Sequence, residues 1–474
     1  MDHVKRMHFV GIYGVAMAAL ALYVRDRGIR VTGTDVQEEF PTRAMLTKAR
    51  IPIDFGFRKD HIRTQHPPDL VVYTGAHGGR ENPEVGEAIR RGIPVLAHGA
   101  ALGKFMEGKR QISVAGSHGK TTAAAMLSAV FASSGHDPSY AVGCGEIFGL
   151  GAAGHNGRGE FFIAEADEYV TDPGHDDTPR FLWQRPEILL VTNIDFDHPD
   201  VYADLTAVQS AFRQLQEREV GQKLTVLCAD DPSSRVLVGR GRNTMTYGFS
   251  PSSDVTVTHV GFGKERTFFT VSERGTEIGD FTLRLPGKHN ALNAAGVIAV
   301  LRSLGISVDH IRDGLLSFHG TKRRFEKIGT IRGVTIYDDY AHHPKEIEAT
   351  IAAARCWYPE KRIITVFQPH TYSRTKALLR DFATAFRQSD IALFTDIYAS
   401  ARETDTLGID GHILVRETQD HHPHARYTAD FTAVRTYLDT IVVPDDIIIF
   451  MGAGDIYSWG KRAMRELGKL APVA

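Results

Sequence analysis

The chain has 474 residues, of which 42% are hydrophobic, and its 55 Lys and Arg against 57 Asp and Glu give a net charge of -2. That length predicts about two to four domains; the balanced charge argues against a nucleic-acid-binding surface, and no apolar run reaches the roughly 18 residues of a membrane span. Three cysteines without zinc-site spacing, Cys144, Cys228 and Cys356, and the lack of an apolar signal segment favour a cytoplasmic protein.

The first region has a β-α-β pattern. Strands are expected at 7–10, 30–35, 70–73 and 94–96, with a helix after the first. Gly11 and Gly14 form the first turn and Asp35 ends the second strand, an arrangement that often binds a nucleotide diphosphate. We expect this domain to span residues 1–108.

The most informative segment lies where a strand at 111–114 meets an alanine-rich helix. It reads Gly116-Ser117-His118-Gly119-Lys120-Thr121-Thr122. Backbone N–H groups of such a turn attract phosphate oxygens, Lys120 adds a positive charge, and the Thr121 hydroxyl can hold Mg²⁺. An ordinary glycine turn is the alternative, and Val114 stands where the common loop has its first glycine. The pattern predicts that ATP binds here with Mg²⁺.

Strands at 161–164 and 188–191 are each followed by polar side chains. Because parallel sheets place ligand-binding groups at the carboxyl ends of strands, Glu165 is the first candidate for holding Mg²⁺ and Glu168 the second. His198 follows the second strand among acids and could ligate another metal or be an ordinary structural histidine.

Two further segments complete the central region, which we expect to span 109–320. A β-rich portion at 254–285 is expected as an insertion before a helix that begins with His289, Asn290 and Asn293. The amide side chains could cap this helix or contact the purine and ribose of a nucleotide. Arg324, in a run of cations near the boundary, could reach the transferring phosphoryl group, unless the run is a solvated linker.

The third region, expected to span 321–474, predicts another mostly parallel sheet. Strands are expected at 334–337, 363–367, 391–394 and 446–450, and helices at 345–355 and 376–387. Asp339 follows the first strand and could accept hydrogen bonds from ribose hydroxyls. His370 and Arg374 follow the second and could hold a carboxylate and a developing negative charge. The sequence thus predicts an α/β protein with three domains in series: a Rossmann-like N-terminal domain, a central P-loop ATPase-like domain and a Rossmann-like C-terminal domain.

Seven ordered motifs together resemble the Mur ligases of peptidoglycan assembly over nearly the full chain. They are Gly-Ser-His-Gly-Lys-Thr-Thr at 116–122, Glu-Ala-Asp-Glu at 165–168, Thr-Asn-Ile-Asp-Phe-Asp-His at 192–198, Gly-Lys-His-Asn-Ala-Leu-Asn at 287–293, Gly-Thr-Lys-Arg-Arg-Phe at 320–325, Asp-Asp-Tyr-Ala-His-His-Pro at 338–344 and Phe-Gln-Pro-His at 367–370. The resemblance implies a first domain that binds a UDP-sugar, a central ATPase domain, and a third domain that brings an amino acid and closes over ATP.

The resemblance also implies roles for single residues. The phosphate-loop residues, with Lys120 and Thr121 foremost, serve ATP; Glu165 and His198 serve the metals; and the adenosine is held by His289, Asn290, Asn293 and Asp339. The candidates for the acyl-phosphate and the amino-acid carboxylate are Arg324, His343, His370 and Arg374. The substrate-binding candidates are Gly11, Gly14, Met17, Asp35, Asn193, His343 and Arg374.

The chain departs from the family pattern at two places. Tyr13 and Ala16 replace glycines of the first loop, and bulkier side chains hold the backbone farther from a diphosphate. A segment at 170–180 is longer and more polar than usual, and could lie near the substrates.

The resemblance implies an ATP-dependent ligase that joins L-alanine to the lactyl carboxylate of UDP-N-acetylmuramate through an acyl-phosphate. The protein is expected to be a monomer or homodimer without nucleic acid or membrane partners. A recycling ligase that attaches a tripeptide to the same sugar is the nearest alternative. A nicotinamide-dependent dehydrogenase and a non-catalytic nucleotide sensor are alternatives from other classes.

Overall fold

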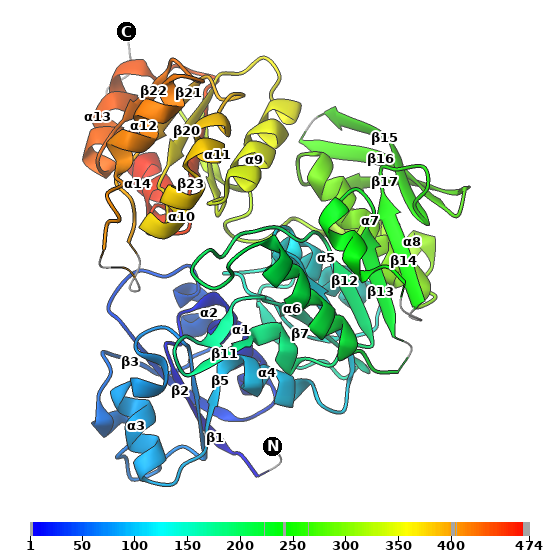
Figure 1. Ribbon diagram of the computed structural model, residues 1–474, viewed down its shortest axis with the longest axis vertical. Coiled ribbons are helices and arrows are strands. Elements are labelled where there is room, and N and C mark those ends of the chain that lie inside the picture. Colours follow the sequence, from blue (N-terminus) through cyan, green and yellow to red (C-terminus); the bar gives the residue numbers. More distant parts are fainter. Residues whose placement is uncertain are drawn as a thin grey trace.

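The computed structural model describes residues 3–221, 223–239, 243–263, 265–399, 403 and 405–467. Three α/β units follow one another along this part of the chain, the first in blue, the central one in cyan and green, and the third in yellow to red (Figure 1). This confirms the predicted fold class. None of the helices described is long and apolar enough to cross a membrane.

The first unit is a five-stranded parallel sheet with its helices. Its strands are β1 (Arg6–Val10), β2 (Arg30–Asp35), β3 (Ile53–Phe55), β4 (Leu70–Tyr73) and β5 (Val95–Ala97), and its helices are α1 (Val15–Asp26), α2 (Arg43–Lys48), α3 (Pro83–Arg90) and α4 (His98–Met106). The strand order is β3-β2-β1-β4-β5. Strand β4 is apolar and buried, and β1 is buried from Met7 onward with His8 as a buried polar residue, as a parallel sheet covered on both faces requires.

The central unit is built around a ten-stranded sheet. Its strands are β6 (Arg110–Ala115), β7 (Ser139–Ala141), β8 (Gly154–His155), β9 (Phe161–Ala166), β12 (Ile188–Val191), β13 (Leu224–Cys228), β14 (Asn243–Gly248), β15 (Val255–Gly263), β16 (Arg266–Glu273) and β17 (Thr276–Leu283). Its helices are α5 (Lys120–Ser133), α6 (Leu205–Glu217), α7 (Lys288–Ser303) and α8 (Val308–Ser317). The strand order is β17-β16-β15-β14-β13-β12-β6-β9-β7-β8, so the strand that precedes the phosphate loop lies inside the sheet.

The β-rich portion at 254–285 forms β15, β16 and β17 and precedes α7, as expected. β15 pairs in parallel with β14 through Tyr247 with Val255 and Gly248 with Thr256. β16 and β17 then add antiparallel strands to the same sheet. The portion therefore lengthens the central sheet at one edge.

The third unit has a six-stranded sheet in the order β18-β19-β23-β20-β21-β22, all parallel except β18. Its strands are β18 (Glu326–Ile331), β19 (Val334–Asp339), β20 (Ile363–Phe367), β21 (Ile391–Phe394), β22 (Ala425–Tyr427) and β23 (Ile447–Met451). Its helices are α9 (Pro344–Trp357), α10 (Tyr372–Ala377), α11 (Leu379–Thr384), α12 (Gly411–Gln419), α13 (Phe431–Ile441) and α14 (Tyr457–Leu467). The single helix expected at 376–387 is wrong, because Leu378, with φ -109° and ψ 20°, separates α10 from α11.

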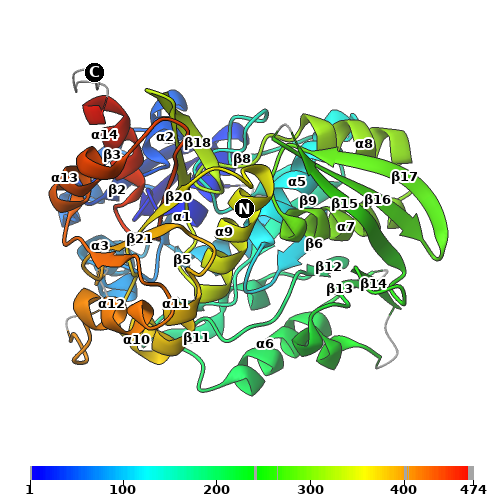
Figure 2. The same ribbon diagram turned by 90° about the horizontal axis from the view of Figure 1, so that it is seen from above.

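The first and central units share one continuous hydrophobic core. The ring of Tyr23 on α1 lies 5.0 Å from that of Phe162 on β9, and both side chains are buried. A Cβ on Gly154 would lie 1.8 Å from the carbonyl oxygen of Ala19, so the close approach of β8 to α1 requires glycine. The third unit has its own cores on the two faces of its sheet. Viewed from above, α9 lies near the middle of the molecule, where the third unit meets the central one (Figure 2).

The predicted domain boundaries remain a prediction. The linker between the first and second sheets falls at 107–109, and that between the central and third units at 318–325. The outer ends of the predicted ranges, at 1–2 and 468–474, lie outside the described residues.

Candidate active site

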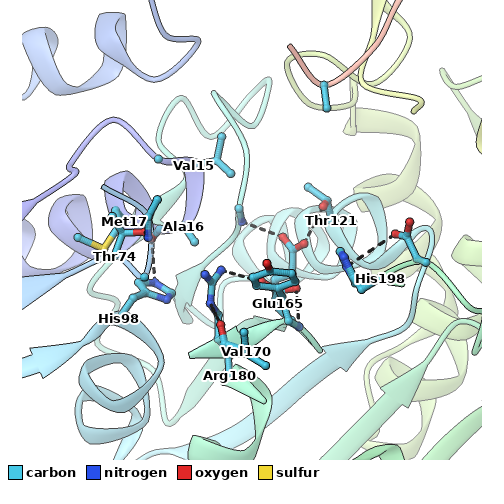
Figure 3. Close-up of a pocket in the computed structure, with 18 of the residues that line it drawn as sticks. Val15, Ala16, Met17, Thr74, His98, Thr121, Glu165, Val170, Arg180 and His198 are labelled. Carbon is cyan, nitrogen blue, oxygen red and sulfur yellow. Dashed lines mark hydrogen bonds and ion pairs between the residues drawn. The ribbon is translucent and has the colours of Figure 1, made fainter. Parts of the chain in front are cut away.

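A cavity of about 1440 Å³ lies where the three units meet. Its lining comes from the loop after β1 and the start of α1, from β9 and the loop after β12, and from the loops after β19 and β20. These loops follow the carboxyl ends of parallel strands, where α/β sheets hold ligands. Figure 3 shows part of the lining, with Met17 and Ala16 on one side and Thr121, Glu165 and His198 on the other.

The phosphate loop between β6 and α5 has a backbone that only glycine tolerates. Gly116 and Gly119 have φ of 141° and 81°, and a Cβ on Gly116 would lie 2.0 Å from Thr192 Oγ1. The His118 N–H donates to Asn193 Oδ1 at 2.9 Å, and Asn193 Nδ2 donates back to the His118 carbonyl at 2.8 Å. Asn193, predicted to contact substrate, therefore holds the loop in shape and is not among the residues that line the cavity.

Lys120 lies at the first position of α5, beside the cavity. Its Nζ is 3.3 Å from Glu168 Oε2 and donates to the Ser117 carbonyl at 3.3 Å. Burial alone would lower the pKa of Lys120, but the carboxylates of Glu168, Asp167 and Glu165 hold it above its usual value. The lysine is therefore charged where phosphates are expected.

Two carboxylates near Lys120 fit a divalent cation. Thr121 Oγ1 donates to Glu165 Oε1 at 2.8 Å, which joins two of the predicted metal ligands. The ligand atoms of Glu168, Asp197 and His198 lie within 4.8 Å of one another. Among the described residues, neither buried oxygen of Glu168 accepts a hydrogen bond. Because hard oxygen ligands suit Mg²⁺, the oxygens of Thr121, Glu165, Glu168 and Asp197 fit that ion, with the His198 imidazole as a further ligand. The first and second choices of the sequence, Glu165 and Glu168, both act on the charge of Lys120.

Third-domain candidates enter the cavity beside this group. Arg374 Nε donates to Asp197 Oδ1 at 3.2 Å, and Arg374 Nη1 lies 3.4 Å from His370 Nδ1. Arg324 Nη1 is 3.5 Å from Glu346 Oε1. Arg324, His370 and Arg374, predicted from separate motifs, all line the same cavity.

His118 joins the central unit to the third. Its Nε2 lies 3.3 Å from Asp195 Oδ2 and its Nδ1 lies 3.4 Å from Glu346 Oε1. Lys345 Nζ is 2.7 Å from the same Asp195 oxygen. The predicted His343 packs its ring 4.7 Å from that of His118, behind the cavity lining. These contacts hold α9 against the phosphate loop.

The adenosine candidates lie behind the phosphate loop and do not line the cavity. Asn290 Nδ2 donates to the Pro286 carbonyl at 2.7 Å, while a Cβ on Gly119 would lie 2.7 Å from Asn293 Oδ1. Burial, with Arg324 nearby, lowers the pKa of His289 to about 4, so its ring is neutral. Asp339 accepts from the backbone N–H groups of Phe325 at 2.7 Å and of Ala341 at 2.8 Å, which also fixes the linker before β18.

Four first-domain candidates have different environments. Gly14 and Met17 line the cavity, whereas Gly11 and Asp35 do not. A Cβ on Gly11, whose φ is 80°, would lie 2.4 Å from the side chain of Thr74. Asp35 accepts from the Tyr13 N–H at 2.7 Å and from the Val36 N–H at 2.8 Å. Its carboxylate therefore shapes the first loop, and contact with substrate remains a prediction.

Glu346, Arg180 and Asp167 are among the cavity residues to which sequence reasoning assigned no role. Glu346, on α9, follows His342 by four residues, and His342 Nδ1 lies 3.2 Å from Glu346 Oε2, a spacing that could have drawn attention to it. Arg180 and its partner Asp167, with Nη1 to Oδ2 at 3.0 Å, meet only because the segment at 170–180 folds back as a hairpin. No local pattern predicts that pairing.

Three family models match the chain: the Mur ligase family catalytic domain at 6–110, the Mur ligase middle domain at 114–301, and the Mur ligase glutamate ligase domain at 323–454. The UDP-N-acetylmuramate–L-alanine ligase of Desulfitobacterium hafniense is 38% identical over 456 residues, 96% of this chain and 98% of that protein. The UDP-N-acetylmuramate–L-alanine ligase of Sorangium cellulosum is 40% identical over 457 residues, which are 96% of this chain and 94% of that protein.

The crystal structure of the UDP-N-acetylmuramate–alanine ligase from Thermotoga maritima superimposes with a TM-score of 0.80 at 27% identity. The match covers 98% of this chain and 99% of that one. Together these matches confirm the resemblance that the seven motifs indicated.

Proposed function

This chain belongs to the Mur ligase family, and from that premise we propose that it joins L-alanine to the lactyl carboxylate of UDP-N-acetylmuramate, with ATP converted to ADP and phosphate. One observation carries the proposal: a phosphate loop with a charged Lys120 borders a cavity whose walls also come from the first and third domains. Relatives that match nearly full length are UDP-N-acetylmuramate–L-alanine ligases, which supports this choice of substrates.

The need for ATP follows from the chemistry of the carboxylate. A free carboxylate is a poor electrophile, so an amide does not form readily from it in water. In the proposed first step, one lactyl carboxylate oxygen attacks the γ-phosphorus and ADP leaves, which gives an acyl-phosphate. Lys120 donates to the phosphate oxygens and offsets their charge. Thr121, Glu165 and the group of Glu168, Asp197 and His198 would hold Mg²⁺, which neutralises phosphate charge.

In the second step the neutral amine of L-alanine attacks the acyl carbon, and inorganic phosphate leaves with the former carboxylate oxygen. Arg374 and His370 hold the alanine carboxylate, and Arg324, which lines the same cavity, contacts the phosphoryl group as it is transferred. Water would hydrolyse the acyl-phosphate, so the third domain must cover the cavity during the reaction. The contacts of His118 with Glu346 and of Lys345 with Asp195 favour that closed arrangement.

The proposal also includes the compartment and the oligomeric state of the enzyme. We place it in the cytoplasm, as a monomer or homodimer, where ATP is available for peptidoglycan precursor synthesis. Its partners in this proposal are its small-molecule substrates. The balanced net charge of -2 argues against a nucleic-acid-binding surface.

Phosphate release tests the proposal directly. The protein is supplied with ATP, Mg²⁺ and UDP-N-acetylmuramate, and then with each amino acid singly or with the L-alanyl-γ-D-glutamyl-meso-diaminopimelate tripeptide. L-alanine should support release far better than any other acceptor. Preference for the tripeptide would instead identify a recycling ligase, and release independent of every acceptor would contradict ligation.

A further inference from the structure

The segment at 170–180, where the chain departs from the family pattern, packs between the first and central domains. β10 (Val170–Asp172) and β11 (Asp176–Pro179) make an antiparallel hairpin, followed by a 3₁₀ helix at Arg180–Trp183. The Arg80 N–H donates to Asp172 Oδ2 at 3.0 Å, and a Cβ on Gly79 would lie 1.9 Å from Asp172 Oδ1. The first domain therefore packs directly on the hairpin.

The 3₁₀ helix that follows the hairpin is also held by close contacts. A Cβ on Gly103 of α4 would lie 2.3 Å from the Trp183 carbonyl oxygen, and the Trp183 indole N–H donates to Thr171 Oγ1 at 3.0 Å. The Arg180 N–H donates to the Tyr169 carbonyl at 2.8 Å. Because Phe181 beside it is fully buried, the backbone of Arg180 has little freedom.

The guanidinium of Arg180 is oriented by contacts along one side. Nε donates to the Val170 carbonyl at 3.1 Å and Nη1 to Asp167 Oδ2 at 3.0 Å. The side chain keeps 16% of its surface exposed and lines the cavity. An arginine has five N–H donors, so these two bonds fix its plane and leave donors for an anion.

Arg180 lies between the two anion sites that the proposed reaction needs. Figure 3 shows it between His98, which contacts the Ala16 carbonyl at the start of α1, and Glu165 beside the phosphate loop. The N-terminus of α1 suits the diphosphate of the UDP-sugar, and Lys120 suits the γ-phosphate of ATP. The sugar carboxylate has to lie between them.

Few cations are available at that position. The first and central domains contribute many residues to the cavity lining. Among those described, the lysine and arginine side chains are those of Lys120 and Arg180. Lys322 and Arg323 of the linker also line the cavity, but Lys322 Nζ donates to the Pro41 carbonyl at 3.3 Å and Arg323 Nη2 to the Gly452 carbonyl at 2.6 Å. Arg324 and Arg374 come from the third domain and pair with Glu346 and Asp197. Arg180 is therefore placed to meet the sugar nucleotide before the third domain closes.

We propose that Arg180 is a substrate-binding residue that donates to the lactyl carboxylate of the sugar nucleotide and then to the acyl-phosphate made from it. Asp167 acts through Arg180 as a positioning residue. The inference rests on the proposed function, which it extends by naming the group that aligns the nucleophile. The alternative is that Arg180 and Asp167 form only a structural ion pair at the base of the hairpin.

Steady-state kinetics of Arg180→Ala and Arg180→Lys, with UDP-N-acetylmuramate, ATP and L-alanine each varied, separate the two roles. Loss of a charge-assisted hydrogen bond should raise KM for the sugar nucleotide about 10- to 100-fold and leave kcat little changed, because the bond is made in the bound ground state and persists in the transition state. KM for ATP and L-alanine should change little. Arg180→Lys should recover part of the loss, and added guanidinium should partly rescue Arg180→Ala.

Arg185→Ala is the matched control, since Arg185 follows the same 3₁₀ helix with an exposed side chain. It should keep wild-type constants. Asp167→Asn should raise KM for the sugar nucleotide less than Arg180→Ala does, and thermal unfolding shows whether each variant is folded. A folded Arg180→Ala with unchanged KM for the sugar nucleotide, or with all three KM values raised equally, would overturn the inference. An inactive wild type would instead contradict the proposed function.

Discussion

Arg374 of the third domain donates through Nε to Oδ1 of Asp197 in the central domain, at 3.2 Å, and both side chains are buried. The two residues are 177 positions apart in the sequence. Separating the domains would break this pair, and breaking it by mutation leaves one charge buried without its partner. A candidate ligand of the amino acid is thereby coupled to the group proposed to hold the metal.

Asp197→Asn should open the third domain. The variant leaves the Arg374 guanidinium without its anion, and loss of one partner of a buried pair costs about 3 to 5 kcal/mol. Small-angle X-ray scattering of the protein without substrates should give a larger radius of gyration than for the wild type. Asp309→Asn, at an exposed pair with Arg312, should leave it unchanged, and equal radii for all three proteins would argue against the coupling.

Glu165→Gln should weaken the response to Mg²⁺. Glu165 accepts from Thr121 at 2.8 Å and from the Gly143 N–H at 2.8 Å, so the amide can retain the fold while losing the charge. The Mg²⁺ concentration for half-maximal phosphate release should rise about 10- to 100-fold. Glu160→Gln, at an exposed residue directly before β9, serves as the control. A Mg²⁺ response like that of the wild type would remove Glu165 from the metal site.

The contact of His118 with Glu346 should weaken in alkali. Burial alone would lower the pKa of His118, but the neighbouring carboxylates of Asp195 and Glu346 raise it to about 9. An unfolded histidine has a pKa of about 6.5. Because the folded value is the higher one, this stabilisation is fully present below about pH 6.5 and is lost as the pH rises towards 9.

Histidine NMR titration measures this directly. The assigned His118 resonance should titrate near pH 9 in the wild type, and Glu346→Gln should move its midpoint towards acid because one of the two carboxylates is gone. The surface residue His310 gives an internal reference in the same spectra. An ordinary midpoint for His118 in the wild type would show that the third domain does not pack on the loop in solution.

Acid should destabilise the protein through its buried histidines. Burial is the main cause that lowers the pKa of His98, His289 and His343 to about 4. The unfolded chain takes up protons below about pH 6.5 whereas these rings do not, so stability falls between about pH 6.5 and pH 4. Each ring accounts for at most about 3 kcal/mol. In urea unfolding, His98→Gln should flatten the pH dependence of the midpoint across that window; an unaltered slope would contradict the assignment.

Local sequence patterns were enough to predict the phosphate loop. A buried strand, two glycines and a lysine before an alanine-rich helix are neighbours in the chain, and β6 and α5 occur where those residues indicate. The same holds for Glu165, which follows an apolar run and occupies the end of β9.

Other features depend on contacts between distant segments. β15 joins the central sheet through two residue pairs with β14, which no periodicity within 254–285 predicts. Asp35 fits the spacing of a nucleotide-binding β-α-β unit, yet its carboxylate accepts a hydrogen bond from the backbone of the loop after β1. The unusual length and polarity of the segment at 170–180 indicated that it lies near the substrates, and Arg180 lines the cavity. Which side chain of the segment enters the cavity depends on how the hairpin packs against another domain, and no local pattern predicts that.

Transfer of an oxygen atom tests the central claim most directly, namely that this chain activates the sugar carboxylate by phosphorylation. UDP-N-acetylmuramate labelled with ¹⁸O in its lactyl carboxylate is turned over with ATP and L-alanine, and the released phosphate is analysed by mass spectrometry. We predict one labelled oxygen in each phosphate formed, and no turnover with Lys120→Ala. Phosphate without label, released at the same rate as the amide forms, would contradict the account.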